Sequence, residues 1–201
     1  MTPTRHQSGG SRARRLQTAD MQTTPTEVSE IAIRIRSLGQ LFNLLDPSPF
    51  FEKDLDSDAE EFIVGWAREL PRTAAVRIAI YLPPEIAALP ETARLGEVLA
   101  HYFNYRARMI ERDLRELFRI GRSALAIGIL ALVLCLTASQ LVAPLAPNPT
   151  AARIIEESFI IVGWVANWRP IEIYLYDWWP LRRRVQLYRR IAAAAVVIKP
   201  E

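Results

Sequence analysis

The sequence predicts an α+β protein in which a small α/β domain is joined by a long amphipathic helix to a two-helix transmembrane hairpin. Two segments, near residues 30–37 and 74–82, alternate apolar and polar side chains with the period of a β-strand. A helical pattern at 58–70 separates them. Further on, Ser123–Val142 is a run of 20 residues without a charge, long enough to cross the roughly 30 Å core of a bilayer.

Composition limits the classes of function open to the chain. It has 201 residues, of which 25 are basic and 22 acidic, and its net charge of +3 is too small to indicate a nucleic-acid partner. Cys135 is the one cysteine, and His6 and His101 are the two histidines, so an internal disulfide is impossible and a structural zinc site is not expected. Arginine far outnumbers lysine, which together with abundant Ala, Leu and Pro suggests a GC-rich bacterial genome.

Residues 1–27 are rich in Ser, Thr, Gln, Arg and Gly and contain no apolar stretch. We therefore expect a disordered cytoplasmic tail here and no cleaved secretory signal. We also expect translation to begin at Met21 instead of Met1, because residues 1–20 resemble read-through of upstream sequence.

The α/β domain is expected at residues 28–92. Its first strand alternates isoleucine with alanine and arginine, which indicates one buried face. Ser57 and Glu60 have the spacing of a capping box and predict the start of the helix, and Pro71 ends it. One face of this helix is expected to carry the apolar residues Ala59, Phe62, Ile63, Trp66 and Leu70.

The rest of the chain divides by its apolar and charged runs. We expect an amphipathic juxtamembrane helix at 93–122, transmembrane helices at 123–143 and 154–178, and an external loop at 144–153. Residues 179–201 should form a basic helix along the inner membrane surface and then a strand near 194–199. That third strand is expected to return to the sheet, so that sequence from both sides of the hairpin builds the domain.

The placement of arginines predicts the orientation of the hairpin. They cluster before the first apolar segment and after the second, whereas the connecting loop contains only Arg153. The positive-inside rule then places the domain and both termini in the cytoplasm of a multi-pass protein of the bacterial inner membrane. Five arginines act either as topology determinants that snorkel to lipid phosphates or as an anionic-lipid site: Arg119, Arg122, Arg182, Arg183 and Arg184.

The stretch NWRPIEIYLYDWWPLRRR, 167–184, brings polar residues into the second apolar segment. A predicted intramembrane polar notch or partner contact consists of Asn167, Arg169, Pro170 and Glu172. If the span begins at Ser158, Arg169 lies near the middle of the bilayer with Glu172 as its counter-charge. If the span begins near Ile154, Arg169 snorkels to the inner headgroups instead. The aromatic belt at the membrane interface would then contain Trp168, Tyr174, Tyr176, Trp178 and Trp179.

Small residues in both apolar segments favour close helix packing. Ala124 and Gly128 have the small-xxx-small spacing in the first segment, and Gly163 lies in the second. Pairs with this spacing are also common by chance, so the alternative is that these residues form no helix interface.

Motifs for chemistry are weak or missing. The segment DLDSDAEE at 54–61 resembles the start of an EF-hand calcium loop, but Ala59 and Gly65 stand where that loop needs Gly and Glu. A helix N-terminus that favours negative charge explains these acids better. His101 is expected on a helix surface, and the sequence contains no phosphate-binding glycine loop. We therefore predict no catalytic, metal-binding or cofactor-binding residue.

Three segments together resemble a family of small bacterial membrane proteins with two spans near the C-terminus: LDPSPFFEKDLDSDAEEFIVGWA, RELFRIGRSALAIGILAL and ESFIIVGWVANWRPIEIYLYDWWPLRRR. The resemblance covers about residues 38–198, and WRPIEIYLYDWWP is its most specific part. The family is uncharacterised, so the resemblance implies the two-span topology and no catalytic residues.

These observations favour a non-enzymatic accessory, scaffolding or regulatory component of a membrane assembly. Its expected partners are membrane lipids and either copies of itself or other membrane proteins, because two helices cannot shield an ion pair at depth alone. One alternative is ion or small-solute transport by a homo-oligomer lined by Asn167, Arg169 and Glu172. The other is a membrane-tethered enzyme with carboxylates at 54–61.

Overall fold

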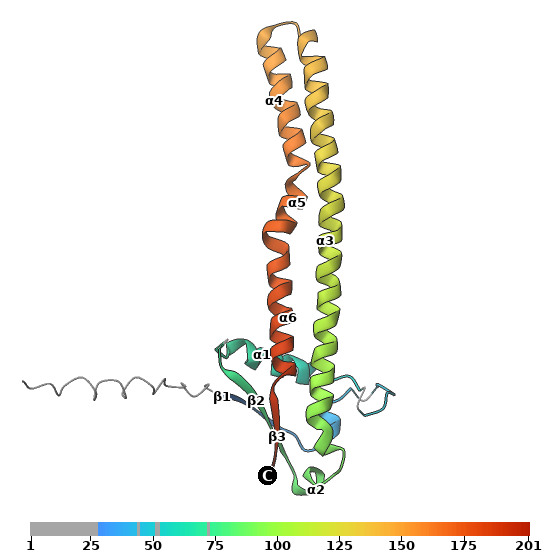
Figure 1. Cartoon of the computed structure of the whole chain (residues 1–201), viewed down its shortest axis with the longest axis vertical. Coiled ribbons are helices and arrows are strands. Elements are labelled where there is room, and N and C mark those ends of the chain that lie inside the picture. The colour runs from blue at the N-terminus through green and yellow to red at the C-terminus, as the bar shows by residue number, and fades with distance from the viewer. Residues whose placement is uncertain (1–27, 44, 51–52, 72) are drawn as a thin grey trace, which may run out of the picture.

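The computed structural model describes residues 28–43, 45–50, 53–71 and 73–201, so the predicted tail at 1–27, with Met1 and Met21, lies outside the described residues. Within them the chain is a mixed α+β protein, as predicted. A small sheet and short helices lie at one end of the molecule (Figure 1). Two long helical segments extend side by side from that end; we call the pair the column and each segment a leg.

The sheet has three parallel strands in the order β1-β2-β3, namely β1 Val28–Arg34, β2 Ala75–Leu82 and β3 Ala195–Pro200. The central strand β2 pairs Ile78 with Ile31 on one side and with Val196 on the other. The C-terminal strand therefore does return to the N-terminal sheet. Ile78 is fully buried and Ile31 is 1% exposed, as the alternating pattern predicts.

Two crossovers connect the parallel strands. The first contains the 3-10 turn η1 Leu38–Gln40 and helix α1 Ser57–Glu69. The second runs from β2 to β3 through the short elements α2 Pro84–Ala87 and η2 Thr92–Arg94 and then through the whole helical column. Because β3 lies beside β2 and runs parallel to it, the chain leaves at the Leu82 end of β2 and must return beside its beginning, where Ala195 pairs with Arg77.

One leg of the column is a single helix, α3 Leu95–Val142, of 48 residues. It covers both the predicted juxtamembrane helix and the first predicted span, and it extends for about 72 Å. Together with its flanking turns, Thr92–Leu145, it is the one helix in the described ranges that is long and apolar enough to cross a membrane by length and composition.

The returning leg is interrupted, and its first break, after Val165, lies about one turn before Pro170, which cannot donate a backbone hydrogen bond. After η3 Ala143–Leu145, it consists of α4 Pro149–Val165, α5 Trp168–Glu172, the π-helical turn η4 Ile173–Asp177 and α6 Trp178–Ala192. The legs lie side by side along the column (Figure 1). Helix α4 begins inside the predicted loop because Asn148 caps it, accepting a hydrogen bond of 2.8 Å from the backbone N–H of Ala151.

The buried face of α1 agrees with the predicted one in part. Ile63 is buried, and Ala59 and Leu70 pack against the core, as predicted. Phe62 and Trp66 are instead 44% and 49% exposed, and Val64 and Ala67 are buried in their place. The stripe that faces the core thus follows the i, i+3, i+4 spacing of a helix, but it is rotated from the predicted face. The core itself lies between the sheet and helices α1, α3 and α6.

Candidate functional site

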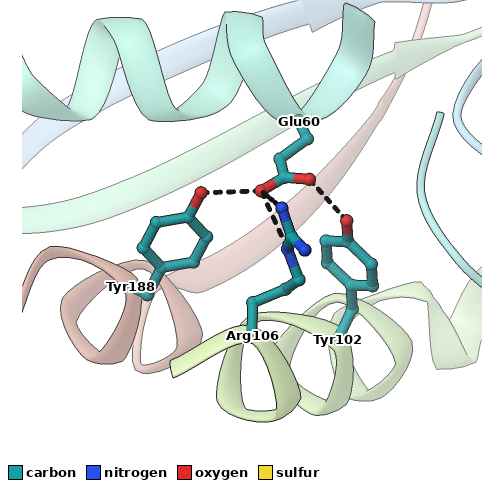
Figure 2. Close-up of polar contacts among 4 residues, drawn as sticks. All are labelled: Glu60, Tyr102, Arg106 and Tyr188. Carbon is teal, nitrogen blue, oxygen red and sulfur yellow. Dashed lines mark hydrogen bonds and ion pairs between the residues drawn. The ribbon is translucent and has the colours of Figure 1, made fainter. Parts of the chain in front are cut away.

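Four polar side chains from three helices meet where the column joins the domain, and we call them the polar junction: Glu60 of α1, Tyr102 and Arg106 of α3, and Tyr188 of α6. Figure 2 shows both hydroxyls and the guanidinium converging on one carboxylate. Tyr102 donates to Glu60 Oε2 at 2.6 Å, and Tyr188 donates to Glu60 Oε1 at 2.6 Å. Arg106 Nε donates to the same Oε1 at 3.1 Å.

Helical spacing explains how α3 contributes two members. Tyr102 and Arg106 are four residues apart, so they lie one turn apart on the same face of α3. Tyr188 comes from α6, which runs antiparallel beside α3 and buries this residue to 4% exposure. The Glu60 side chain is 13% exposed. The junction is thus a partly buried contact among segments that are far apart in the sequence.

The predicted capping box at Ser57 and Glu60 is wrong. The cap is Asp56, which accepts a hydrogen bond of 3.0 Å from the backbone N–H of Asp58. Because Asp56 already caps the helix, Glu60 is free to face the tyrosines. A signal for the junction was present in the i, i+4 pair of Tyr102 and Arg106, but nothing local identifies their partner.

The electrostatics hold every member in one protonation state. Burial by itself would raise the pKa of the Glu60 carboxyl, but hydrogen bonds from Tyr102 and Tyr188 and the charge of Arg106 outweigh it and lower this pKa. Burial and the neighbouring carboxylate raise the pKa of both phenols. At neutral pH Glu60 is therefore ionised and the tyrosines are neutral. Such a group fixes helices together and offers no proton donor or acceptor tuned for catalysis near neutral pH.

Two more contacts of α6 strengthen this joint. Arg189 forms an ion pair with Glu111 of α3. Arg190 donates to the backbone carbonyls of Pro71 and Ala74, which lie between α1 and β2; the distance to the Ala74 oxygen is 2.6 Å. The base of the column is therefore tied to α1, to β2 and to its own opposite leg.

The predicted polar notch is divided between the inside and the outside of the column. Asn167 points inward, and its Nδ2 donates to the carbonyls of Gly128 and Gly163 at 3.0 Å each. Pro170 is buried. Arg169 lies on the outside, where it pairs with Glu172 at 2.8 Å, as the spacing suggested, and also with Asp177 at 3.2 Å, which the sequence did not suggest.

Gly128 and Gly163 lie where each leg is in close contact with the other. A methyl group added to Gly128 would lie 2.6 Å from Asn167 Oδ1, and one added to Gly163 would lie 2.8 Å from Leu132 Cδ1. Ala124 is half-buried one turn away from Gly128. The small residues thus permit the inward hydrogen bonds of Asn167.

The predicted basic and aromatic residues lie around the middle of the legs and from there toward the domain. Arg119, Arg122 and Arg184 are exposed. Arg182 lies over the ring of Trp178, and Arg183 lies over the ring of Trp179. The aromatic residues fall into two groups, because Trp168 packs on Trp164 at 5.8 Å, whereas Trp178 and Trp179 pack on each other at 5.2 Å. Tyr174 and Tyr176 lie between these groups, on η4.

Among the residues that the structure describes, no three His, Cys, Asp or Glu side chains lie together as potential metal ligands. His101 is exposed on α3, and Cys135 is a free, half-buried thiol.

Comparison of the chain with models of known protein families, with curated proteins and with solved structures found no match.

Proposed function

We propose that this is an integral membrane protein of the bacterial inner membrane that serves as an accessory, scaffolding or regulatory component of a larger assembly. In this proposal the end of the column that lies away from the sheet, which we call the upper column, is a membrane hairpin, and the α/β domain lies in the cytoplasm. One observation carries it: in the upper column, large apolar side chains face outward and small or polar residues face inward.

The outward residues come from both legs. Ile127 and Leu141 of α3 are 68% and 69% exposed, and Ile161 of α4 is 61% exposed. At the same levels the buried residues are Gly128, Ser139 and Gly163. A water-soluble helix pair would bury its large apolar residues, because their exposure to water costs about 25 cal/mol per Å². Hydrocarbon removes that cost and leaves close backbone packing to hold the helices together.

Polar groups of the upper column make their hydrogen bonds within it. Thr137 and Ser158 donate to carbonyls one turn back in their own helices at 2.8 and 2.7 Å. The Asn167 amide bridges both legs, as described above. Satisfied polar side chains of this kind are what a bilayer core requires.

The register between the legs supports a shallow depth for Arg169. Asn167 lies level with Gly128, and Ile173 lies level with Gly121. Arg169 therefore lies between these levels, within about two turns of the Arg122 end of the first apolar segment. This favours the interpretation in which the second span begins early and Arg169 reaches the inner headgroups.

The second span would consist of α4 and the beginning of α5. Helix α4 has 17 residues and extends for about 26 Å, but Arg153, Glu156 and Glu157 lie in its first half, so its uncharged part at 158–165 is shorter than a bilayer core. The turn after Val165 lets the leg continue to the aromatic and arginine residues at the domain end. Because those arginines outnumber the single Arg153 near the loop, the positive-inside rule favours a cytoplasmic domain and cytoplasmic termini.

A role in an assembly is supported by the outer face of the hairpin. Arg169, Glu172 and Asp177 form ion pairs there and are 57%, 42% and 30% exposed. These exposed charges offer polar contacts to a neighbouring helix, whether from a copy of this chain or from another protein. The junction, which ties the hairpin rigidly to the domain, suits a scaffold better than an enzyme. Asn167 is occupied inside the hairpin, so it is not free to line a transport pathway.

Single-cysteine labelling tests this topology. Two reporters, Thr150→Cys at the loop end and Glu85→Cys on the domain, are made in a Cys135→Ala background, because both positions are exposed. A membrane-impermeant maleimide should label the Thr150 reporter in intact spheroplasts, and the Glu85 reporter only after lysis. Extraction of the protein by alkaline carbonate, or the reversed labelling pattern, would contradict the proposal. Crosslinking in membranes should capture a homo-oligomer or a specific partner, and a strictly monomeric chain would argue against an assembly.

A further inference from the structure

A pocket of about 470 Å³ opens between the C-terminal end of α1 and α6. Four arginines line it, Arg68 from α1 and Arg183, Arg184 and Arg190 from α6. Leu70 and Leu187 supply an apolar wall. None of the predicted binding sites included Arg68 or Arg190, because the two helices are more than 100 residues apart and meet only in the folded chain.

The positive charge in this pocket has no acidic counterpart. No carboxylate is among the lining residues. Within the described part of the chain, Arg68, Arg183 and Arg184 form no ion pair. Arg190 donates to the carbonyls of Pro71 and Ala74 in the connection between α1 and β2. Arg68, Arg183 and Arg184 thus line the pocket without a carboxylate to balance their charge, and a bound anion would relieve their mutual repulsion.

The chemistry of the pocket identifies the class of ligand. Guanidinium groups bind phosphate through paired N–H donors, and arginine is preferred wherever phosphate is recognised in this way. The leucine wall suits an aliphatic or other apolar portion beside the charged group. The volume lies within the range of small-molecule sites, about 300 to 1,000 Å³.

We propose that this α1–α6 pocket binds a phosphate group that carries an apolar portion. The group comes either from the headgroup of an anionic phospholipid or from a soluble phosphate ester. The lipid source rests on the proposed membrane function: Arg183 lies about one turn beyond Trp178 and Trp179, where headgroup phosphates would be in that orientation. The phosphate chemistry does not depend on that orientation.

A ligand in this pocket would act on the polar junction. Arg184, which lines the pocket, also interacts with the Tyr188 hydroxyl. Phosphate bound between α1 and α6 therefore tightens the same pair of helices that Glu60 and Tyr188 connect. We expect binding to increase the protection of α1 amides from hydrogen exchange.

The test uses the full chain purified in mild detergent and compares two variants with one control. Arg68→Gln and Arg183→Gln each remove one exposed guanidinium from the pocket. Arg182→Gln is the matched control, because it removes the same charge from the adjacent position and the same kind of contact with a tryptophan, 5.6 Å from Trp178, but lies outside the pocket. Native mass spectrometry measures retention of phosphatidylglycerol against phosphatidylcholine, and calorimetry measures binding of inorganic phosphate.

Each pocket variant should weaken binding about fivefold, the equivalent of about 1 kcal/mol per arginine, whereas the control should stay within about twofold of wild type. Selective loss of phosphatidylglycerol would identify a lipid. If the pocket variants lose only the binding of inorganic phosphate, the ligand is a soluble phosphate ester. That conclusion would stand even if the chain proved not to be embedded in a membrane. Equal loss in Arg182→Gln, or no binding of either probe by the wild type, would overturn the site.

Discussion

The Glu60 carboxylate on α1 accepts a hydrogen bond of 2.6 Å from the Tyr188 hydroxyl on α6, across 128 positions of sequence. Glu60 lies in the first crossover, and Tyr188 lies in the returning leg of the column, shortly before β3. Their contact therefore joins the two crossovers. Together with the contacts of Arg190 to Pro71 and Ala74, it ties the returning leg to the domain.

Substitution of Glu60 should loosen this joint. Glu60→Gln keeps the shape of the side chain but removes the charge that Arg106 and both tyrosines require, so the free energy of unfolding should fall by about 1 to 3 kcal/mol. Glu61→Gln removes the same charge from the exposed face of α1 and should change it by less than about 0.5 kcal/mol. Denaturation of the detergent-solubilised protein measures both, with hydrogen exchange locating the change in α1. Equal effects of the two substitutions would show that the junction contributes no specific stability.

The polar junction should also make the free energy of unfolding depend on pH in the acidic range. Because the pKa of Glu60 in the folded protein is lower than its ordinary value of 4.5, its stabilising contribution is complete above that value and is lost as the pH falls through the folded pKa. Comparison of wild type with Glu60→Gln between about pH 6 and pH 3 isolates this group, since the lowered pKa of Asp46 is common to both proteins. The stability difference should shrink as the solution is acidified. A difference independent of pH would contradict the assignment.

Two glycine-to-alanine substitutions should act in opposite directions. At Gly128 the new methyl group would meet Asn167 Oδ1 at 2.6 Å and the Ala166 carbonyl oxygen at 3.0 Å, so the legs must separate, at a cost of about 1 to 3 kcal/mol. At Gly65 in α1 nothing lies within 4 Å, and alanine should stabilise the helix by about 0.5 to 1 kcal/mol. Thermal melting of the two variants checks the contrast. A melting temperature of Gly128→Ala at or above wild type would mean that the legs do not pack as described.

The Asn167 amide should contribute to hairpin stability. Asn167→Ala removes its hydrogen bonds to the carbonyls of Gly128 and Gly163, and we expect a loss of about 0.6 to 2 kcal/mol in an SDS unfolding titration. Asn104→Ala, at an exposed position of α3, is the control and should leave the titration midpoint in place. If both variants unfold at the wild-type midpoint, Asn167 does not hold the legs together.

Features with a local cause could be read from the sequence. The alternation of isoleucine in β1 and β2 follows from strand geometry, and Ile31 and Ile78 are buried as that geometry requires. The length of α3 follows from an apolar and amphipathic pattern without a strong breaker. The pairing of Arg169 with Glu172 follows from helical spacing.

Features that depend on distant contacts needed the tertiary structure. Ser57 and Glu60 have the spacing of a capping box, but Glu60 turns instead to Tyr102 and Tyr188, because three helices meet there and Asp56 already caps α1. The same packing rotates α1 and leaves Phe62 exposed.

The level of Arg169 belongs to the same class, because it depends on how one leg lies against the other, whereas the break after Val165 has a local cause in Pro170. The sequence by itself therefore determined which segments are strands, helices and apolar runs, since these patterns arise within a few turns of backbone. Only the tertiary structure decided which side chains meet, since such contacts depend on the register between elements far apart in the chain.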